Sequence, residues 1–94
     1  MIKQNKEDYK ICIVGLGYVG LPLAARFVLK GFDITGFDIK DERINELNNK
    51  VDVNNDISDK NLETFVKKSK LTSNIDDIKK CNIFIDLHLR LWSI

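Results

Sequence analysis

The feature that most constrains this chain is a glycine-rich turn between an apolar run and a helical pattern. The apolar run occupies residues 11–14 (ICIV), the turn occupies residues 15–20 (GLGYVG), and the helical pattern continues to Gly31. A short β-branched run predicts a strand, so the order is strand, glycine turn and helix. This order is typical of the opening of a dinucleotide-binding βαβ unit.

Each glycine of the turn has a separate physical reason. Gly15 allows the chain to turn sharply off the strand, and Gly17 allows a pyrophosphate to approach the backbone. Gly20 allows the helix to pack closely against the strand. The phosphates would lie at the helix N-terminus, where N–H groups and the helix dipole favour negative charge. The predicted cradle consists of Gly15, Leu16, Gly17, Tyr18, Val19 and Gly20. The alternative is a turn that only packs a helix onto a strand.

A carboxylate at the expected distance supports the dinucleotide interpretation. Residues 33–37 (DITGF) predict a second strand, and Asp38 follows Gly15 by 23 residues. The spacing expected for the carboxylate that binds the adenosine ribose is about 20 residues. Such a carboxylate repels a 2′-phosphate, which favours NAD over NADP. The alternative for Asp38 is a turn carboxylate at a strand end.

Two cations just beyond Asp38 weaken the preference for NAD. Lys40 and Arg43 could accommodate a 2′-phosphate. Arg43 could instead lie along the edge of the adenosine, or it could be a solvated charge on a helix. FAD and S-adenosylmethionine share parts of this pattern, and both rank below NAD.

The rest of the chain alternates helical and strand patterns. Apolar spacing and capping residues predict helices over 18–30, 41–49 and 59–68, the last with Ser58 as its N-cap. Asn74 can cap a short helical turn over 75–80. Strands are expected at 10–14, 71–73 and from Cys81 onward. In the first helix, Val19, Leu23 and Phe27 share a face that Ala24 and Val28 extend. The fold class is therefore α/β, a Rossmann-type doubly wound parallel sheet of about four strands in the order 3-2-1-4, truncated relative to a full dinucleotide fold.

Composition excludes several function classes. A length of 94 residues allows one small domain, and a net charge of +1 implies no basic field for nucleic acid. Apolar runs are too short for a membrane span, and residues 1–9 lack the apolar centre of a signal peptide. Cys12 and Cys81 match no metal or redox spacing, so we expect two free thiols in a reducing cytoplasm, with no metal ligand and no catalytic nucleophile.

Two segments resemble a known family. GLGYVGLPLA (residues 15–24) and GFDIKDERINEL (residues 36–47) are similar to the start of the UDP-glucose/GDP-mannose dehydrogenases. Within that family the first segment is most similar to enzymes acting on UDP-N-acetylhexosamines such as UDP-N-acetylmannosamine. The resemblance covers about residues 10–85. It implies that residues 15–20, Asp38 and Arg43 occupy NAD-contacting positions.

The resemblance ends abruptly near the last predicted strand. The family continues there with a Val-Pro-Thr-Pro-like loop, whereas this sequence reads DLHLRLWSI over 86–94. His88 and Trp92 are therefore poor functional candidates. The resemblance also implies that the cysteine nucleophile, its supporting groups and the sugar site lie in later parts of a family member. We expect no catalytic residue here and no turnover by this chain alone.

These observations define an organisation and two functional hypotheses. We expect a flexible tail over 1–9, a partial NAD-binding domain over 10–85 and a divergent tail over 86–94. The first hypothesis is the NAD-binding N-terminal part of a nucleotide-sugar 6-dehydrogenase, with NAD(H) as partner and a UDP-sugar as substrate of the intact enzyme. The second is a non-catalytic adenine-dinucleotide-binding module, or an inactive remnant. Exposed sheet edges predict self-association into a homo-oligomer or aggregate.

Overall fold

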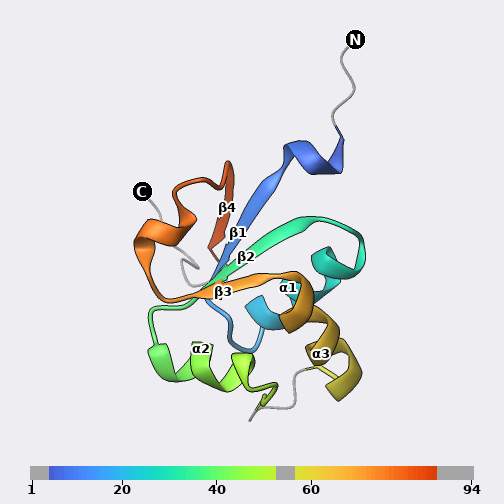
Figure 1. The fold of residues 1–94 in the computed structure, drawn as a ribbon, viewed down its shortest axis with the longest axis vertical. Helices are drawn as coiled ribbons and strands as arrows, with labels where there is room; N and C mark the ends of the chain where they lie inside the picture. Colours follow the sequence, from blue (N-terminus) through green and yellow to red (C-terminus); the bar gives the residue numbers. More distant parts are fainter. Residues whose placement is uncertain (1–4, 53–56, 87–94) are drawn as a thin grey trace.

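A parallel sheet of four strands organises the computed structural model, which describes residues 5–52 and 57–86. The strands are β1 (Lys10–Val14), β2 (Asp33–Phe37), β3 (Lys70–Thr72) and β4 (Ile83–Asp86), in the spatial order β3-β2-β1-β4 (Figure 1). The predicted order is confirmed. β1 pairs with β2 from Lys10 opposite Asp33 to Val14 opposite Phe37. Both strands therefore end at the same edge of the sheet, and the glycine turn and Asp38 follow them there.

Three α-helices connect the first strands. They are α1 (Gly20–Leu29), α2 (Asp41–Asn48) and α3 (Asp59–Lys68), and the short 3₁₀ helix η2 (Ile75–Ile78) leads to β4 (Figure 1). Ser58 caps α3 by accepting a hydrogen bond from the Asn61 N–H, and the Asn74 side chain accepts one from the Asp76 N–H at the start of η2. These side-chain caps bond N–H groups that the first turn of a helix leaves without an intrahelical partner. The sequence predicted both caps.

The core lies between the sheet and the helices. Its buried side chains come from β1, the glycine turn, α1, β2, α2 and α3: Ile11, Ile13, Leu16, Leu21, Ala24, Ala25, Val28, Ile34, Ile44, Leu47, Leu62 and Phe65. The near-continuous apolar run of β1 is explained by burial of three successive residues, Ile11, Cys12 and Ile13. A parallel strand covered on both faces has this pattern.

The buried face of α1 differs from the predicted one. α1 begins at Gly20 and not at residue 18, because the turn continues through Val19, which is 56% exposed. Leu21 and Ala25 are buried, whereas Leu23 and Phe27 are only partly buried. The prediction was therefore right for Ala24 and Val28, which are buried, and wrong for Val19. Ala24 and Ala25 lie in the core together with Leu21, and Leu23 and Phe27 pack against this cluster.

Smaller differences concern the segments around the core. β3 begins at Lys70, one residue before its predicted start, and η2 ends at Ile78, two residues before its predicted end. Residues 1–4 lie outside the described part, but Lys6–Asp8 forms the 3₁₀ helix η1 where the sequence predicted a flexible tail. His88 and Trp92, with most of the expected divergent tail, also lie outside the described residues.

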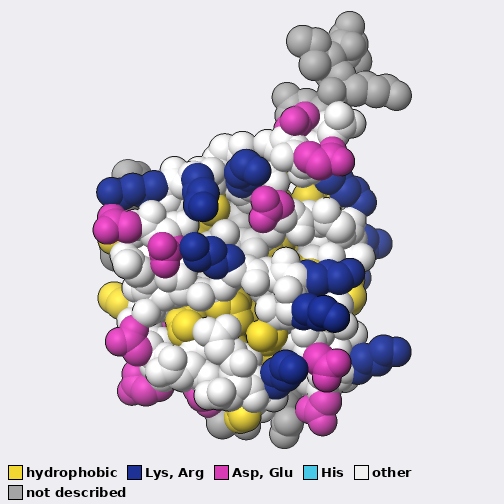
Figure 2. Space-filling view, in the orientation of Figure 1, with side chains coloured by type: hydrophobic (Ala, Val, Ile, Leu, Met, Phe, Trp, Pro, Cys, Tyr) yellow, Lys and Arg dark blue, Asp and Glu magenta, His cyan; other side chains and the backbone are white. Residues whose placement is uncertain are grey.

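Charges of both signs occur over the face shown in Figure 2, without a continuous field of one sign. This distribution agrees with the net charge of +1. Among the described residues, no helix combines the length and the apolar composition needed to cross a bilayer.

Candidate dinucleotide site

The glycine turn begins at the end of β1, where its first residue is hydrogen-bonded to the end of β2. The Gly15 N–H donates to the Phe37 carbonyl at 2.7 Å, and Gly15 then takes a φ of +93°. Residues with a Cβ rarely adopt this left-handed conformation. Gly15 therefore allows the sharp turn, as the sequence predicted.

Gly20 and Gly17 have opposite surroundings. A Cβ on Gly20 would lie 1.7 Å from the Gly15 carbonyl oxygen, so only glycine fits at the start of α1. The close approach is mainly to the backbone of the turn, whereas the sequence predicted an approach to β1. A Cβ on Gly17 would meet nothing within 4 Å. The space beside Gly17 is thus open to a ligand, which is what a phosphate cradle requires.

The remaining residues of the turn divide into an exposed pair and a buried anchor. Tyr18 and Val19 are 78% and 56% exposed, whereas Leu16 is completely buried. The Leu16 side chain lies over Gly36 of β2, where an added Cβ would come within 3.0 Å of Leu16 Cδ1. Only the backbone of Leu16 can therefore face a ligand.

Asp38 lies directly against the glycine turn. One carboxylate oxygen accepts a hydrogen bond from the Leu16 N–H at 3.0 Å, and the other accepts one from the Lys40 N–H at 2.9 Å. Asp38 is only 9% exposed. A carboxylate has about four lone-pair positions, so two backbone donors leave acceptor capacity for a ribose. The structure thus brings together the two features that the sequence predicted separately, the cradle and the carboxylate.

Arg43 lies against the backbone of the glycine turn at Leu16. It is 7% exposed, its Nε donates to the Leu16 carbonyl at 2.6 Å, and its Nη1 lies 3.3 Å from an Asp52 carboxylate oxygen. The alternative of a solvated helix charge is therefore wrong. A buried guanidinium requires a counter-charge and hydrogen-bond acceptors, and Asp52 and Leu16 supply both.

Asp52 is the residue of this site that the sequence did not indicate. It belongs to no motif, and the chain has 14 acidic residues, any of which could have paired with Arg43. The available signal was indirect: an arginine next to the cradle that is buried must have an acidic partner. Its position follows only from how the chain returns after α2.

The two cysteines are free thiols, and Cys12 is poorly suited to nucleophilic chemistry. Burial of the thiol, the nearby Cys81 and a hydrogen bond between the two side chains raise the pKa of Cys12 from 9.0 to about 12. Because the thiolate is the reactive form, Cys12 stays unreactive at neutral pH. Within residues 5–52 and 57–86, no group of three or more His, Cys, Asp or Glu side chains is arranged to hold a metal ion.

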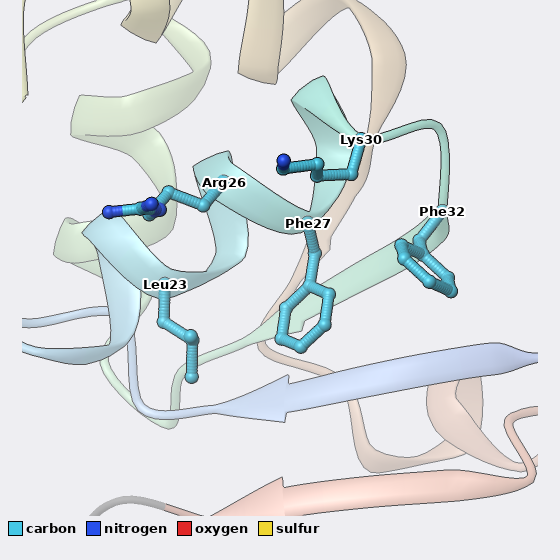
Figure 3. A pocket seen from close by; sticks show the side chains of 5 residues that line it. All are labelled: Leu23, Arg26, Phe27, Lys30 and Phe32. Atoms are coloured by element: carbon cyan, nitrogen blue, oxygen red, sulfur yellow. The ribbon is translucent and has the colours of Figure 1, made fainter.

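A cavity lies beside α1. Leu23, Phe27 and Phe32 point toward the strands, and Arg26 and Lys30 lie along the other side of the cavity (Figure 3). The volume is about 230 Å³, and three of the five lining side chains are apolar. Because Phe32 comes just before β2, this cavity extends toward the amino ends of the strands, away from Asp38. None of its five lining residues is a carboxylate, so this cavity offers no such acceptor to a ribose.

A parallel sheet in the order β3-β2-β1-β4, a glycine turn open beside Gly17 and a carboxylate bonded to that turn define a Rossmann-type dinucleotide-binding module. Residues 9–85 match the model of the NAD-binding domain of the UDP-glucose/GDP-mannose dehydrogenase family, and the chain belongs to this family.

Curated relatives agree with this assignment. The chain is 47% identical over 79 residues to a UDP-N-acetyl-D-glucosamine 6-dehydrogenase of Salmonella typhi, a match covering 84% of this chain and 18% of that protein. It is 32% identical over 87 residues to a UDP-N-acetyl-D-mannosamine dehydrogenase of Methanocaldococcus jannaschii, covering 89% of this chain and 20% of that protein. The chain thus spans about a fifth of the length of these relatives and corresponds to their NAD-binding part.

Solved structures give the same result. The UDP-D-ManNAc dehydrogenase of Pyrococcus horikoshii superposes with a TM-score of 0.73 at 36% identity, covering 82% of this chain and 19% of that one. A GDP-mannose dehydrogenase of Pseudomonas aeruginosa superposes with a TM-score of 0.70 at 20% identity, over 82% of this chain and 19% of that one, and supports the fold alone.

Proposed function

We propose that this chain binds NAD through the ADP half of the cofactor, as the N-terminal NAD-binding part of a UDP-sugar 6-dehydrogenase. The observation that carries the proposal is the position of the Asp38 carboxylate, bonded to the Leu16 N–H at the edge of the glycine turn. A pyrophosphate would approach the backbone at Gly17, and the adenosine ribose would donate its hydroxyl hydrogen bonds to Asp38. Bound NAD supplies a hydride acceptor to the intact enzyme.

Selectivity for NAD over NADP follows from the charges around Asp38. The carboxylate repels a 2′-phosphate, and the buried Arg43 cation is already bonded to Asp52 and to the Leu16 carbonyl. Lys40 remains the exposed cation nearest in sequence to Asp38, and its own N–H donates to that carboxylate. The Asp38 charge and the bonded Arg43 support a preference for the unphosphorylated ribose, and the exposed Lys40 side chain opposes it.

The substrate class is proposed from the relatives. The Salmonella typhi and Methanocaldococcus jannaschii proteins are named for UDP-N-acetylglucosamine and UDP-N-acetylmannosamine. A UDP-N-acetylhexosamine is therefore our first choice for the intact enzyme, and UDP-glucose is the alternative.

The free thiols of Cys12 and Cys81 agree with a reducing compartment, and we propose a cytoplasmic location.

Calorimetric titration of NAD, NADP and ADP into the purified chain and into Asp38→Asn tests the proposal. We expect NAD and ADP to bind the wild-type chain with similar affinity, and NADP to bind more weakly. Asp38→Asn should lose roughly tenfold or more in NAD affinity, since a charge-assisted hydrogen bond is worth about 1.5–3 kcal/mol. The difference between NAD and NADP should shrink because the repelling charge is gone.

Asp33→Asn is the matched control. It removes the same charge from the other end of β2, where Asp33 pairs with Lys10 at 3.6 Å and is 59% exposed. We expect its NAD affinity to equal that of the wild-type chain. Saturable NAD binding that is unaffected by Asp38→Asn, or a folded wild-type chain without NAD binding, would contradict the proposal.

A further inference from the structure

The Leu16 peptide is the most constrained part of the glycine turn. Its N–H donates to Asp38 at 3.0 Å, its carbonyl accepts from Arg43 Nε at 2.6 Å, and its side chain is fully buried over Gly36. The peptide immediately precedes Gly17, the residue beside which the ligand space is open. Because the Leu16 carbonyl and the Gly17 N–H lie in one peptide plane, fixing this carbonyl also fixes the direction in which the Gly17 N–H points.

The hold of Arg43 on this carbonyl depends on a second buried group. The Arg43 and Asp52 side chains are 9% and 3% exposed, and their charged atoms are 3.3 Å apart. Without a carboxylate at this place, a buried guanidinium would gain free energy by moving toward water. Such a movement would break the bond to the Leu16 carbonyl.

Asp52 is itself fixed by the chain on its other side. Its second carboxylate oxygen accepts a hydrogen bond from the Ile57 N–H at 3.3 Å, just before the Ser58 cap of α3. Asp52 therefore joins three parts of the molecule, namely the glycine turn through Arg43, the end of the α2 segment, and the start of α3.

We propose that Asp52 is a positioning residue for the dinucleotide site, which acts through Arg43 to hold the Leu16 carbonyl and so preorganise the phosphate cradle. This inference rests on the proposed NAD binding and extends it to a residue outside the glycine motif and outside the ribose position. Preorganisation of the turn lowers the free-energy cost of ordering it around the ligand, so its loss reduces affinity.

The test measures the cradle with and without ligand in Asp52→Asn, which keeps the shape of the side chain and removes its charge. Amide hydrogen exchange at Leu16 and Gly17, followed by NMR on the ligand-free chain, reports the turn directly. Calorimetry with NAD and ADP reports affinity. We expect faster exchange at these two amides and roughly tenfold weaker binding of both ligands, the ratio that corresponds to about 1.4 kcal/mol.

Two further variants separate positioning from general stability. Ile11→Val removes a methylene from a buried residue at the amino end of β1, far along the strand from the turn, and should leave the Leu16 exchange rate and the affinity unchanged. Asp52→Glu restores the charge and should recover part of the affinity that Asp52→Asn loses. A purely structural contribution would not depend on the charge in this way.

A double variant, Arg43→Met with Asp52→Leu, answers the question if Asp52→Asn does not fold. Replacing both members of a buried ion pair by apolar residues is often neutral or stabilising. The folded double variant lacks the donor to the Leu16 carbonyl, so exchange at Leu16 and Gly17 should again be faster than in the wild-type chain.

Each outcome decides the proposal. Unchanged exchange in a folded Asp52→Asn or in the double variant overturns it, and so does faster exchange with unchanged NAD and ADP affinity. A wild-type chain that binds no NAD overturns the proposed function, and the exchange measurement still shows whether Asp52 orders the turn.

Discussion

At the residue scale, the glycine turn contains two glycines whose roles are different in kind. Gly20 is required by packing, because a Cβ there would meet the Gly15 carbonyl oxygen at 1.7 Å. Gly17 is not required by packing, because its Cβ position is open. The glycine motif alone does not distinguish the two positions. In the structure, Gly20 is needed for packing, and Gly17 leaves space for a ligand.

Gly20→Ala and Gly17→Ala should therefore have opposite effects. We expect Gly20→Ala to lower the free energy of unfolding by at least about 1–3 kcal/mol, the usual cost of overpacking. Gly17→Ala should unfold at nearly the wild-type temperature, and its NAD affinity should fall because the methyl group occupies the ligand space. Thermal unfolding and calorimetric titration of both variants check this pair, and a Gly17→Ala variant with wild-type NAD affinity would refute the role given to the open side.

At the same scale, the structure adds contacts of Asp38 and Arg43 that the sequence did not predict. The sequence predicted Asp38 as a ribose acceptor, and the structure adds that it bonds the Leu16 N–H of the turn. The family resemblance implied that Arg43 contacts the cofactor. In the structure, Arg43 Nε donates a hydrogen bond to the Leu16 carbonyl. Its direct contact with NAD stays a prediction.

At the scale of elements, α2 and the start of α3 hold the residues that support the glycine turn. α2 follows Asp38 closely and presents Arg43, while α3 begins immediately after the Ile57 N–H that bonds to Asp52. A substitution at the start of α3 should therefore lower the free energy of unfolding. It should affect the dinucleotide site only indirectly, through Asp52.

Ser58→Ala tests the start of α3. Its Oγ accepts from the Asn61 N–H at 3.2 Å, and loss of such a cap costs about 1 kcal/mol. We expect the unfolding temperature to fall by roughly 4–8 °C, the shift per kcal/mol typical of a domain of this size. Ser58→Asp keeps a capping oxygen and should retain stability. An unfolding temperature unchanged by Ser58→Ala would show that the cap contributes little to this helix.

At the scale of the whole molecule, β3 and β4 are the outer strands of the described sheet. Phe84 of β4 is 52% exposed, and its strand pairs with β1 on one side. An outer strand with an exposed aromatic residue favours pairing with another chain.

Phe84→Lys should therefore reduce self-association of the purified chain. A charge on an outer strand opposes edge-to-edge pairing. Light scattering over a range of concentrations measures the mass, and Leu29→Lys is the control, since Leu29 is similarly exposed (53%) but lies at the end of α1. We expect the wild-type chain and the control to associate and Phe84→Lys to remain smaller. A wild-type chain that is monomeric throughout would refute this expectation.

The sequence by itself determined the sheet order, the helices and the place of the cradle. Strand polarity, right-handed crossovers and the glycine spacing are local or topological properties, and they reduce the possible topologies of residues 10–85 to a handful. Only the tertiary structure decided which face of α1 is buried, that Gly20 packs against the Gly15 carbonyl, and that Asp52 pairs with Arg43. These contacts depend on the distance between elements far apart in the chain, and no local pattern specifies that distance.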